Sequence, residues 1–384
     1  MIEIPRKFVG LAAVNAEANS EKTLAKRQWK GAEGLAEDVR HYGQWMRDEA
    51  KRRIGHLYPE VEITSALAKV RPDLKPLIGQ KLTVIAWLWA RTVKSPNPAF
   101  ADVDVPLVST FMLSTKPGKE TYVEPVIENS NYHFTVKVGK PKNADVAQNG
   151  TKLSRGANFR CVMSGTPIDG EYIKAEGKAG RMGVRLMAIV AEGERARVYV
   201  PPMPNHEAVA RQAAPEWRPD VTISGSTQYL GVKPYGMEQF SQLFTDRQTV
   251  ALTTFSDLVR EARERVLKDA EAANRHPDSR RLSDGGTGAV AYADAVSVYL
   301  AFGVDRSADF WCSLCIWANQ PKNELVTHVF GRQALPMTWD FGEVNVFSKS
   351  GGNFLKNLEY VVKAISVGGP IAGVAVQADA QTQD

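Results

Sequence analysis

Two cysteines three positions apart offer the first candidate chemistry in this sequence. Cys312 and Cys315 form a Cys-x-x-Cys motif inside the apolar string FWCSLCIW. Such a pair can carry a redox reaction or supply two thiolates to a zinc ion, although a zinc ribbon needs two pairs to complete its tetrahedral shell. Cysteine is also among the residue types most often buried. The apolar setting therefore favours two core cysteines on a helix, with a redox or metal role as the alternative.

A second polar group is mixed with aromatic residues in the segment 331–354, GRQALPMTWDFGEVNVFSKSGGNF. We expect this segment to be a loop whose side chains could line a pocket. The candidates are Trp339, Asp340, Glu343, Asn345 and Phe347. The alternative is a long connection held in place by Trp339 and Phe341.

Other signatures of catalysis are missing, and we predict no catalytic residue. The sequence has no Gly-rich turn between a strand and a helix, no P-loop, no nucleophile elbow and no two histidines at metal-ligand spacing. Thr245 to Gln248, in contrast, match a capping box, in which Thr245 accepts a backbone hydrogen bond and Gln248 reaches back. Arg247 inside this box could point at a DNA phosphate, although the structural reading as a helix cap is the stronger one.

The composition is that of a globular protein with two or three domains. The chain has 384 residues, of which 43% are hydrophobic, and a net charge of +5. This mildly basic balance permits contact with nucleic acid without requiring it. Three cysteines make no disulfide framework, and neither a signal peptide nor an apolar run of about 18 residues is visible. We therefore expect a cytoplasmic protein without membrane association.

The elements that must position these residues follow from hydrophobic periodicity. Residues 1–8 resemble the exit from an element, where Pro5 stops regular structure, and a loop over 9–30 leads to a helix over about 34–55. The middle of the chain is β-rich. The predicted strands cover residues 82–93, 105–113, 121–127, 132–138 and a hairpin over 181–200 that turns at 192–194.

The last third of the chain is predicted to be helical. Leu252, Phe255, Val259, Ala262 and Val266 form one apolar stripe at helical spacing. The predicted helices cover about 246–272, 289–309 and 354–366, and a short strand covers 369–380. Between the elements we expect loops over 139–158 and 273–288 and a proline-rich linker over 201–240.

These elements define an α+β protein with a β-rich module and helical segments. The predicted organisation is a mainly helical connector over 1–80, a β-rich module over 81–202, a linker over 203–240, a helical region over 241–368 and the start of a further strand over 369–384.

Several long strings resemble one protein family, the large adenine-specific DNA methylases of bacteria and archaea that carry an embedded zinc-ribbon module and serve modification or phage defence. The strings are WKGAEGLAEDVRHYGQWMRDEAKRRIGHLYP (29–59), VIAWLWARTVKSPNPAF (84–100), FTDRQTVALTTFSDLVREARERV (244–266) and VFGRQALPMTWDFGEVNVFSKSGGNF (329–354). The resemblance runs along essentially the whole chain.

The resemblance implies a Rossmann-like α/β methyltransferase fold that binds S-adenosylmethionine through a Gly-rich turn and holds the flipped base with an Asp-Pro-Pro-Tyr loop. This chain resembles the central insertion of that fold, truncated at both ends, and it contains neither motif. By the same resemblance, Asp379 would contact the cofactor adenine. A strand-end aspartate in a surface turn is the alternative.

The resemblance also implies a degenerate zinc ribbon. The family has two cysteines at the positions of Ser95 and Phe100 and two more at the positions of Cys161 and Ser164. One thiol of four is retained here, and serine and phenylalanine do not replace thiolates as zinc ligands. We therefore expect no bound zinc.

Two functions remain open. The chain could be a fragment of an S-adenosylmethionine-dependent DNA adenine methyltransferase that is inactive alone and does not bind the cofactor. It could instead be a non-catalytic subunit that binds DNA or assembles with separate methylase pieces. Weak contact with DNA phosphates would involve arginines on helices whose other faces are apolar, although ordinary ion pairs within the helices are the alternative. The candidates are Arg247, Arg260 and Arg263.

Overall fold

The computed structural model describes residues 3–18, 29–194, 196–226 and 228–367. The chain is a mixed α+β protein, as the sequence predicts, with several small antiparallel sheets. It divides into two compact units. A helical unit comprises residues 1–49, 255–305 and 355–384, and a β-rich unit comprises residues 50–254 and 306–354. No helix in these described stretches is both long and apolar enough to cross a bilayer.

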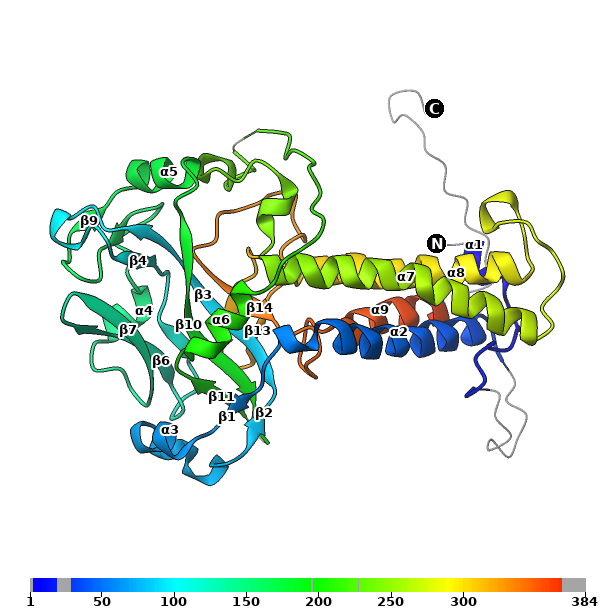
Figure 1. Cartoon of the computed structure of the whole chain (residues 1–384), viewed down its shortest axis with the longest axis horizontal. Helices are drawn as coiled ribbons and strands as arrows, with labels where there is room; N and C mark the ends of the chain where they lie inside the picture. Colours follow the sequence, from blue (N-terminus) through cyan, green and yellow to red (C-terminus); the bar gives the residue numbers. More distant parts are fainter. Residues whose placement is uncertain (1–2, 19–28, 195, 227, 368–384) are drawn as a thin grey trace. The chain divides into compact units, whose positions relative to one another are not determined.

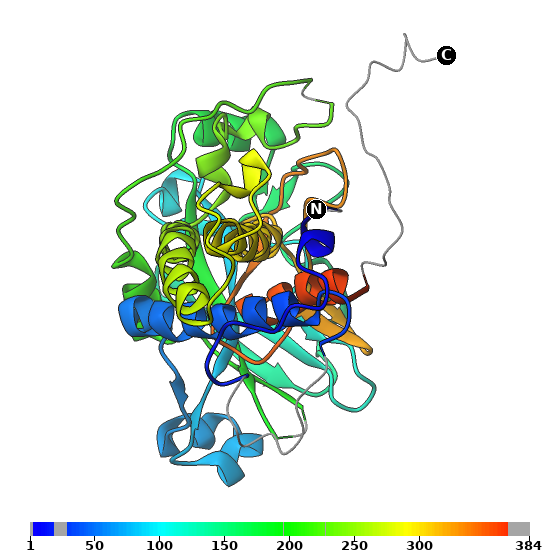
Figure 2. The ribbon, with the colours of Figure 1, turned by 90° about the vertical axis from the view of Figure 1, so that its right-hand side faces the viewer.

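The helical unit is built from parts of four long helices and one short helix. These are α1 (Glu3–Lys7), α2 (Glu33–Ile54), α7 (Asp246–Ala272), α8 (Ala289–Ala308) and α9 (Phe354–Val367). Within this unit α2, α7, α8 and α9 lie side by side (Figure 1), and α2 crosses α7 and α8 at an angle (Figure 2). Gly43 on α2 and Gly303 on α8 allow this close packing, because a Cβ at either position would lie 2.0 or 2.7 Å from a methyl carbon of Leu358.

The long helices confirm the sequence-based prediction. The predicted stripe of α7 is largely buried, with Phe255, Ala262 and Val266 at 0% exposure. A helix whose apolar residues recur every three to four positions must bury that face, so periodicity alone locates it. The prediction was wrong at the start of the chain, where α1 includes Pro5. Proline is compatible with the first turn of a helix, because the first backbone N–H groups have no intrahelical acceptor.

The β-rich unit centres on a five-stranded antiparallel sheet. Its strand order is β11-β10-β3-β14, and β4 also pairs with β3. The strands are β3 (Val84–Lys94), β4 (Asp104–Leu107), β10 (Gly183–Glu192), β11 (Arg197–Val200) and β14 (Asp340–Val344). Figure 1 shows β3 running between β10 and β14. Every residue of β3 except Lys94 is buried, as its continuous apolar run predicts.

Smaller elements surround this sheet. A three-stranded sheet contains β5 (Met112–Ser114), β6 (Thr121–Glu128) and β7 (Asn131–Val138). Three further two-stranded sheets are β1 (Val61–Glu62) with β2 (Lys81–Leu82), β8 (Phe159–Arg160) with β9 (Pro167–Ile168), and β12 (Trp317–Gln320) with β13 (Asn323–Val326). The short α-helices are α3 (Ser65–Val70), α4 (Ala144–Asn149), α5 (Gly170–Lys178) and α6 (Pro204–Arg211).

Several predicted loops contain regular structure. The expected linker over 201–240 includes α6, and the expected loop over 139–158 includes α4. The expected loop over 331–354 includes β14, which pairs with β3. Such short elements carry too few residues to show a period, and β14 is defined by its partner strand instead. The predicted strand over 369–380 lies outside the described residues.

Candidate functional site

One face of the central sheet carries an unusual group of aromatic and charged side chains. Trp87, Trp89 and Arg91 alternate along β3, so they point to the same face. In the antiparallel register, Glu343 of β14 lies opposite Trp87 and Phe341 opposite Trp89, which places them on that face too. The pairing of two strands about 250 positions apart therefore assembles this group.

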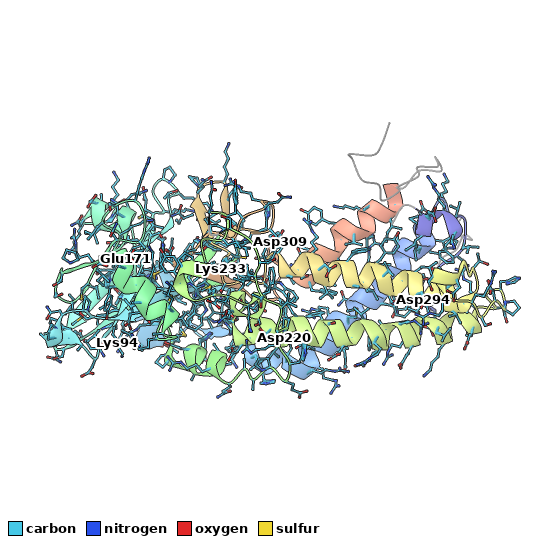
Figure 3. The ribbon with its side chains drawn as sticks, turned by 90° about the horizontal axis from the view of Figure 1, so that it is seen from above. Lys94, Glu171, Asp220, Lys233, Asp294 and Asp309 are labelled. Carbon is cyan, nitrogen blue, oxygen red and sulfur yellow. The ribbon has the colours of Figure 1, made fainter. Side chains whose placement is uncertain are left out.

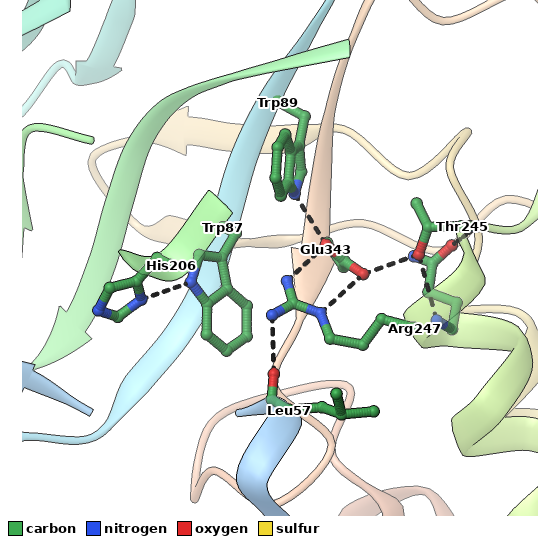
Figure 4. Close-up of polar contacts among 8 residues, drawn as sticks. Leu57, Trp87, Trp89, His206, Thr245, Arg247 and Glu343 are labelled. Carbon is green, nitrogen blue, oxygen red and sulfur yellow. Dashed lines mark hydrogen bonds and ion pairs between the residues drawn. The ribbon is translucent and has the colours of Figure 1, made fainter. Parts of the chain in front are cut away.

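Glu343 is the anionic centre of the group (Figure 4). Its side chain is buried and receives four hydrogen bonds. The two guanidinium donors of Arg247 lie 3.1 and 2.6 Å from the carboxylate oxygens. The indole N–H of Trp89 donates at 2.8 Å and the hydroxyl of Thr245 at 2.7 Å. The carboxylate is thus fully hydrogen-bonded inside the protein.

Arg247 faces the interior, so the expectation that it projects outward was wrong. It is 1% exposed, and its guanidinium carbon lies 3.9 Å from the ring centre of Trp87 and 5.4 Å from that of Tyr58. Its remaining terminal nitrogen donates to the carbonyl oxygen of Leu57 at 3.0 Å. A guanidinium paired with a carboxylate and stacked on aromatic rings can be buried without leaving its donors unsatisfied.

The capping box that positions Arg247 is confirmed. The Thr245 backbone N–H donates to the Gln248 side chain at 2.9 Å, and the Gln248 backbone N–H donates to the Thr245 hydroxyl at 3.1 Å. The cap fixes the first turn of α7 beside the sheet. Sequence analysis identified this start of the helix but not the direction of Arg247, because the carboxylate that attracts it is 96 positions away.

His206 extends the buried network on the other side of Trp87 (Figure 4). Its Nδ1 accepts a hydrogen bond from the Trp87 indole N–H at 2.9 Å. Burial, together with the nearby positive charge of Arg247, lowers the pKa of His206 to about 4. The imidazole is therefore neutral at neutral pH.

Arg91 is the second buried arginine on this face, and its surroundings differ from those of Arg247. It is 6% exposed and donates to the carbonyl oxygens of Thr338 and Ser313 and to the Ser313 hydroxyl, at 2.7, 3.1 and 3.0 Å. Within the described part of the chain it has no carboxylate partner. Burial lowers the pKa of Arg91 to about 10, so it remains charged at neutral pH.

A cavity of about 290 Å³ opens between these two arginines. Its walls include Trp89, Phe341, Phe244 and Val184. The cavity thus combines apolar and aromatic surface with a few convergent polar groups, a combination typical of small-molecule sites.

The sequence indicates one residue of this site but not its main cation. Of the five pocket candidates only Glu343 lines the cavity, and Trp339, Asp340, Asn345 and Phe347 do not. Phe341, expected only to hold a long connection in place, lines it as well. Trp339 packs in a separate core cluster, and the Asn345 amide donates to the Val84 carbonyl. Arg91 was overlooked within the predicted strand 82–93. One feature of the sequence could have indicated its role. Arg91 is a single charged residue inside an otherwise apolar run, and a charge buried in a strand needs polar partners or a ligand.

The two cysteines of the Cys-x-x-Cys motif are buried, as predicted, but they lie in a turn rather than on a helix. The Cys312 thiol contacts the Leu243 carbonyl at 3.4 Å, and the Cys315 thiol contacts the Phe310 carbonyl at 3.3 Å. Burial raises the pKa of Cys315 well above its ordinary value, and the neighbouring Cys312 adds to this shift. In the described stretches no three histidine, cysteine or acidic side chains form a metal-binding group.

The four positions assigned to a degenerate zinc ribbon lie in two loops that meet. Ser95 Oγ lies 3.4 Å from Cys161 Sγ, and Ser164 also hydrogen-bonds to this thiol. Burial raises the pKa of Cys161, but the bonds from Ser164 and Ser95 outweigh burial and bring the pKa below its ordinary value. One thiol with two hydroxyls and Phe100 does not provide a zinc donor set, so these residues do not fit the metal.

An apolar cluster surrounds Cys161. Cys161 packs with Phe159 and Ile168 of the β8–β9 hairpin and with Val93 and Val105. Core packing thus holds the two loops together in this chain.

The remaining predicted DNA contacts lie on the helical unit and are already paired. Arg260 pairs with Asp257 at 3.4 Å and is 76% exposed. Arg263 is less exposed and donates to Asp294 at 2.7 Å, as does Arg281 to the other carboxylate oxygen (Asp294 is labelled in Figure 3). The Arg260–Asp257 pair lies within α7 and is of the kind expected as the alternative to DNA contact, whereas Arg263 pairs with Asp294 of another helix, α8. Asp379 lies outside the described residues.

A group of lysines at one end of the β6–β7 hairpin is exposed instead. Thr121 pairs with Val138 at this end, and the Gly139 backbone N–H donates to the Glu120 carbonyl, so Lys119 and Lys140 flank the paired end and Lys142 follows two residues later. All three lysines are exposed, and none forms an ion pair with another described residue. Lys116, three residues before Lys119, pairs with Glu324 instead. We call Lys119, Lys140 and Lys142 the lysine cluster.

Comparison with known proteins adds no family to these observations. No protein-family model, no curated protein and no solved structure matches the chain.

Proposed function

We propose that this chain serves adenine-specific DNA methylation as a non-catalytic part. In this role it contacts DNA phosphates and works together with polypeptide that supplies the S-adenosylmethionine turn and the base-holding loop. The sequence resemblance to the large adenine-specific DNA methylases suggests this function. One structural observation supports the resemblance most directly, namely the 3.4 Å contact between Ser95 and Cys161.

This contact matters because the two residues are 66 positions apart. The resemblance assigned them to opposite halves of a zinc ribbon, and the two halves of a ribbon must meet for four ligands to surround one ion. The two loops meet here although the metal ligands are not retained. A ribbon that lost its metal but kept its packing would have this arrangement.

Contact with DNA is supported by the lysine cluster rather than by the arginines of α7. Exposed lysines without acidic partners can bind phosphate oxygens, whereas a paired arginine must first leave its aspartate. Such contacts carry no sequence information by themselves. The proposed contribution of this chain is therefore to hold duplex DNA, with base recognition left to other parts.

Restoring the missing ligands tests the resemblance. We expect a variant with Ser95→Cys, Phe100→Cys and Ser164→Cys, together with the native Cys161, to bind about one zinc ion per chain. With Co²⁺ in its place, it should show the absorption of a tetrahedral thiolate site. The matched control carries Ser109→Cys, Ser130→Cys and Ser154→Cys, three cysteines that do not converge on Cys161. A folded restored variant that binds no more zinc than this control would overturn the ribbon assignment.

The non-catalytic role is tested on the unmodified chain. Isothermal titration with S-adenosylmethionine should give no saturable binding up to about 1 mM, because a close backbone approach to the cofactor needs a Gly-rich turn. Methyl transfer to duplex DNA by the chain alone would contradict the proposal. So would micromolar cofactor binding.

A further inference from the structure

Arg91 presents a buried charge without a carboxylate partner among the described residues, although its guanidinium carbon lies 5.2 Å from the ring centre of Phe341. Nε and Nη2 donate to two carbonyls and one hydroxyl, all neutral groups. Nη1 has no hydrogen-bond partner among the residues that the structure describes. The nearby Arg247 has its own carboxylate in Glu343, so that acid is not available to Arg91.

Such an arrangement is unfavourable without a counter-ion. Removing a cation from water is costly, and neutral carbonyls offset this cost only in part. The surroundings lower the pKa of Arg91 to about 10, which records this cost without removing the charge at neutral pH. An anion beside Nη1 would restore the missing electrostatic partner, because a guanidinium matches carboxylate and phosphate oxygens in geometry and charge.

The space beside Arg91 is suited to such an anion and to an organic group attached to it. Arg91 lines the cavity of about 290 Å³, together with the rings of Trp89 and Phe341. The hydroxyl and carbonyl of Ser313 lie at the same wall. Two acids line this cavity, and each is already paired with an arginine: Glu343 with Arg247, and the exposed Asp246 with Arg218.

An entry path is present. Val184 and Arg211 line this cavity and also a wider groove of about 820 Å³. Val184 is 41% exposed and lies opposite Arg91 in the pairing of β10 with β3. Arg211 is exposed and pairs with Glu207 at 2.8 Å, so the mouth carries a cation whose charge is already balanced. The cavity and the groove therefore adjoin at these two residues.

We propose that this cavity binds a small organic acid. Its carboxylate or phosphate group lies against Arg91 Nη1, and its apolar or aromatic body lies along Trp89, Phe341 and Phe244. The enclosed position of Arg91 favours a free small molecule over a polymer backbone. This site is independent of the proposed role in DNA methylation.

Matched small probes test the charge requirement. Benzoate and phenyl phosphate carry the two acid types on one aromatic ring, benzamide is a neutral analogue of benzoate, and inorganic phosphate lacks the ring. By isothermal titration we expect saturable one-site binding of benzoate or phenyl phosphate, at least tenfold tighter than that of benzamide. The stronger of the two acids identifies the acid type. If inorganic phosphate bound as tightly as benzoate and phenyl phosphate, the proposed contact of the ligand's apolar body with the aromatic walls would be wrong.

Two variants locate the binding. Arg91→Gln should weaken binding of the acid by about tenfold to a hundredfold, the range for losing one charge-assisted hydrogen bond. Because this variant can also disturb the core, Val184→Trp closes the mouth without altering the buried network, and Val221→Trp is its control at an exposed position away from the cavity. We expect Val184→Trp to abolish binding and Val221→Trp to preserve it. No saturable binding up to about 20 mM overturns the proposal, and so does binding that Val184→Trp leaves unchanged.

Discussion

Arginine is used in opposite ways in the two units. On α7 of the helical unit, Arg260 and Arg263 remain at the surface, and each meets an aspartate. In the β-rich unit Arg91 and Arg247 are both buried. Arg247 pairs with the buried Glu343, whereas Arg91 has no carboxylate partner in the part of the chain that the structure describes. Net charge and residue counts describe these four arginines as equivalent. Burial separates them, and with it the energetic consequence of losing each one.

The helical unit also has one enclosed acid that serves a structural purpose. Asp38 on α2 accepts hydrogen bonds from the backbone N–H groups of Val14 and Asn15 at 2.7 and 3.0 Å, and from the Tyr292 hydroxyl at 2.6 Å. Burial raises the pKa of Asp38, although these bonds oppose the shift. The Asp38 carboxylate is thus hydrogen-bonded by neutral donors, whereas the Arg91 guanidinium is hydrogen-bonded by neutral acceptors. Arg91, in addition, lines a cavity.

The largest effect should come from breaking the enclosed ion pair. We expect Arg247→Met or Glu343→Leu to lower the free energy of unfolding by about 3–5 kcal/mol, because each leaves a buried charge without its partner. The double variant should lose less than the sum of the two. Urea denaturation measures these changes.

The surface counterpart is Arg260→Ala, which removes the exposed pair with Asp257. This variant should change the free energy of unfolding by about 0.5 kcal/mol or less. If Arg247→Met proved as mild as Arg260→Ala, the contrast between the two units would not hold.

The second-largest expected effect is a pH dependence of stability that arises from His206 in the β-rich unit. His206 is fully buried and its folded-state pKa is about 4, below the ordinary value of 6.5. The unfolded chain therefore binds a proton first as the pH falls. The stability contribution is complete above pH 6.5 and is lost between about pH 6.5 and 4, by up to roughly 3 kcal/mol. Unfolding measured at pH 7 and pH 5 should show about 2 kcal/mol of this loss, because pH 5 lies inside the titration range.

His206→Gln separates this residue from other titrating groups. Glutamine can still accept the Trp87 indole hydrogen bond but does not titrate, so the variant should be less sensitive to pH between 7 and 5 than the native chain. An identical pH dependence in both proteins would assign the effect to another group.

The sequence predicted those parts of the molecule that repeat locally. The stripe from Leu252 to Val266 located α7, and the apolar run of β3 located the central strand. It did not predict β14, nor the directions of Arg247 and Arg91. These depend on partners far away along the chain, and a five-residue strand or a single charged side chain carries no period of its own. Of the five residues suggested for a pocket, only Glu343 therefore lines the cavity.

The third prediction concerns the shared aspartate of the helical unit. Asp294 receives Arg263 and Arg281 at 2.7 Å each, so Asp294→Asn removes the counter-charge of two partly exposed arginines. We expect a loss of about 1–2 kcal/mol in unfolding free energy, between the values for the enclosed and the exposed pair. Asp257→Asn, which affects only the exposed pair with Arg260, is the matched control. Equal losses in the two variants would mean that partial burial adds nothing here.

The smallest effect should appear in DNA binding. The two alternative contact surfaces are the lysine cluster of the β-rich unit and the arginines of the helical unit. Weak, non-specific binding to a duplex should fall steeply as salt rises, because each phosphate contact releases counter-ions. Replacing the three residues of the lysine cluster by alanine should reduce the affinity at about 50 mM salt by roughly tenfold. It should also reduce the slope of log affinity against log salt by about 2–3, since each lost contact contributes roughly 0.9.

The comparison variant carries Arg260→Ala and Arg263→Ala and should leave the slope nearly unchanged, because these arginines are already neutralised by aspartates. Fluorescence anisotropy across a salt series measures both variants, with circular dichroism as the folding control. If the arginine variant lowered the slope more than the lysine variant, the DNA contact would lie on the helical unit instead. Undetectable binding of the native chain at about 50 mM salt would remove DNA as a partner of either unit, since phosphate contacts are strong at low salt.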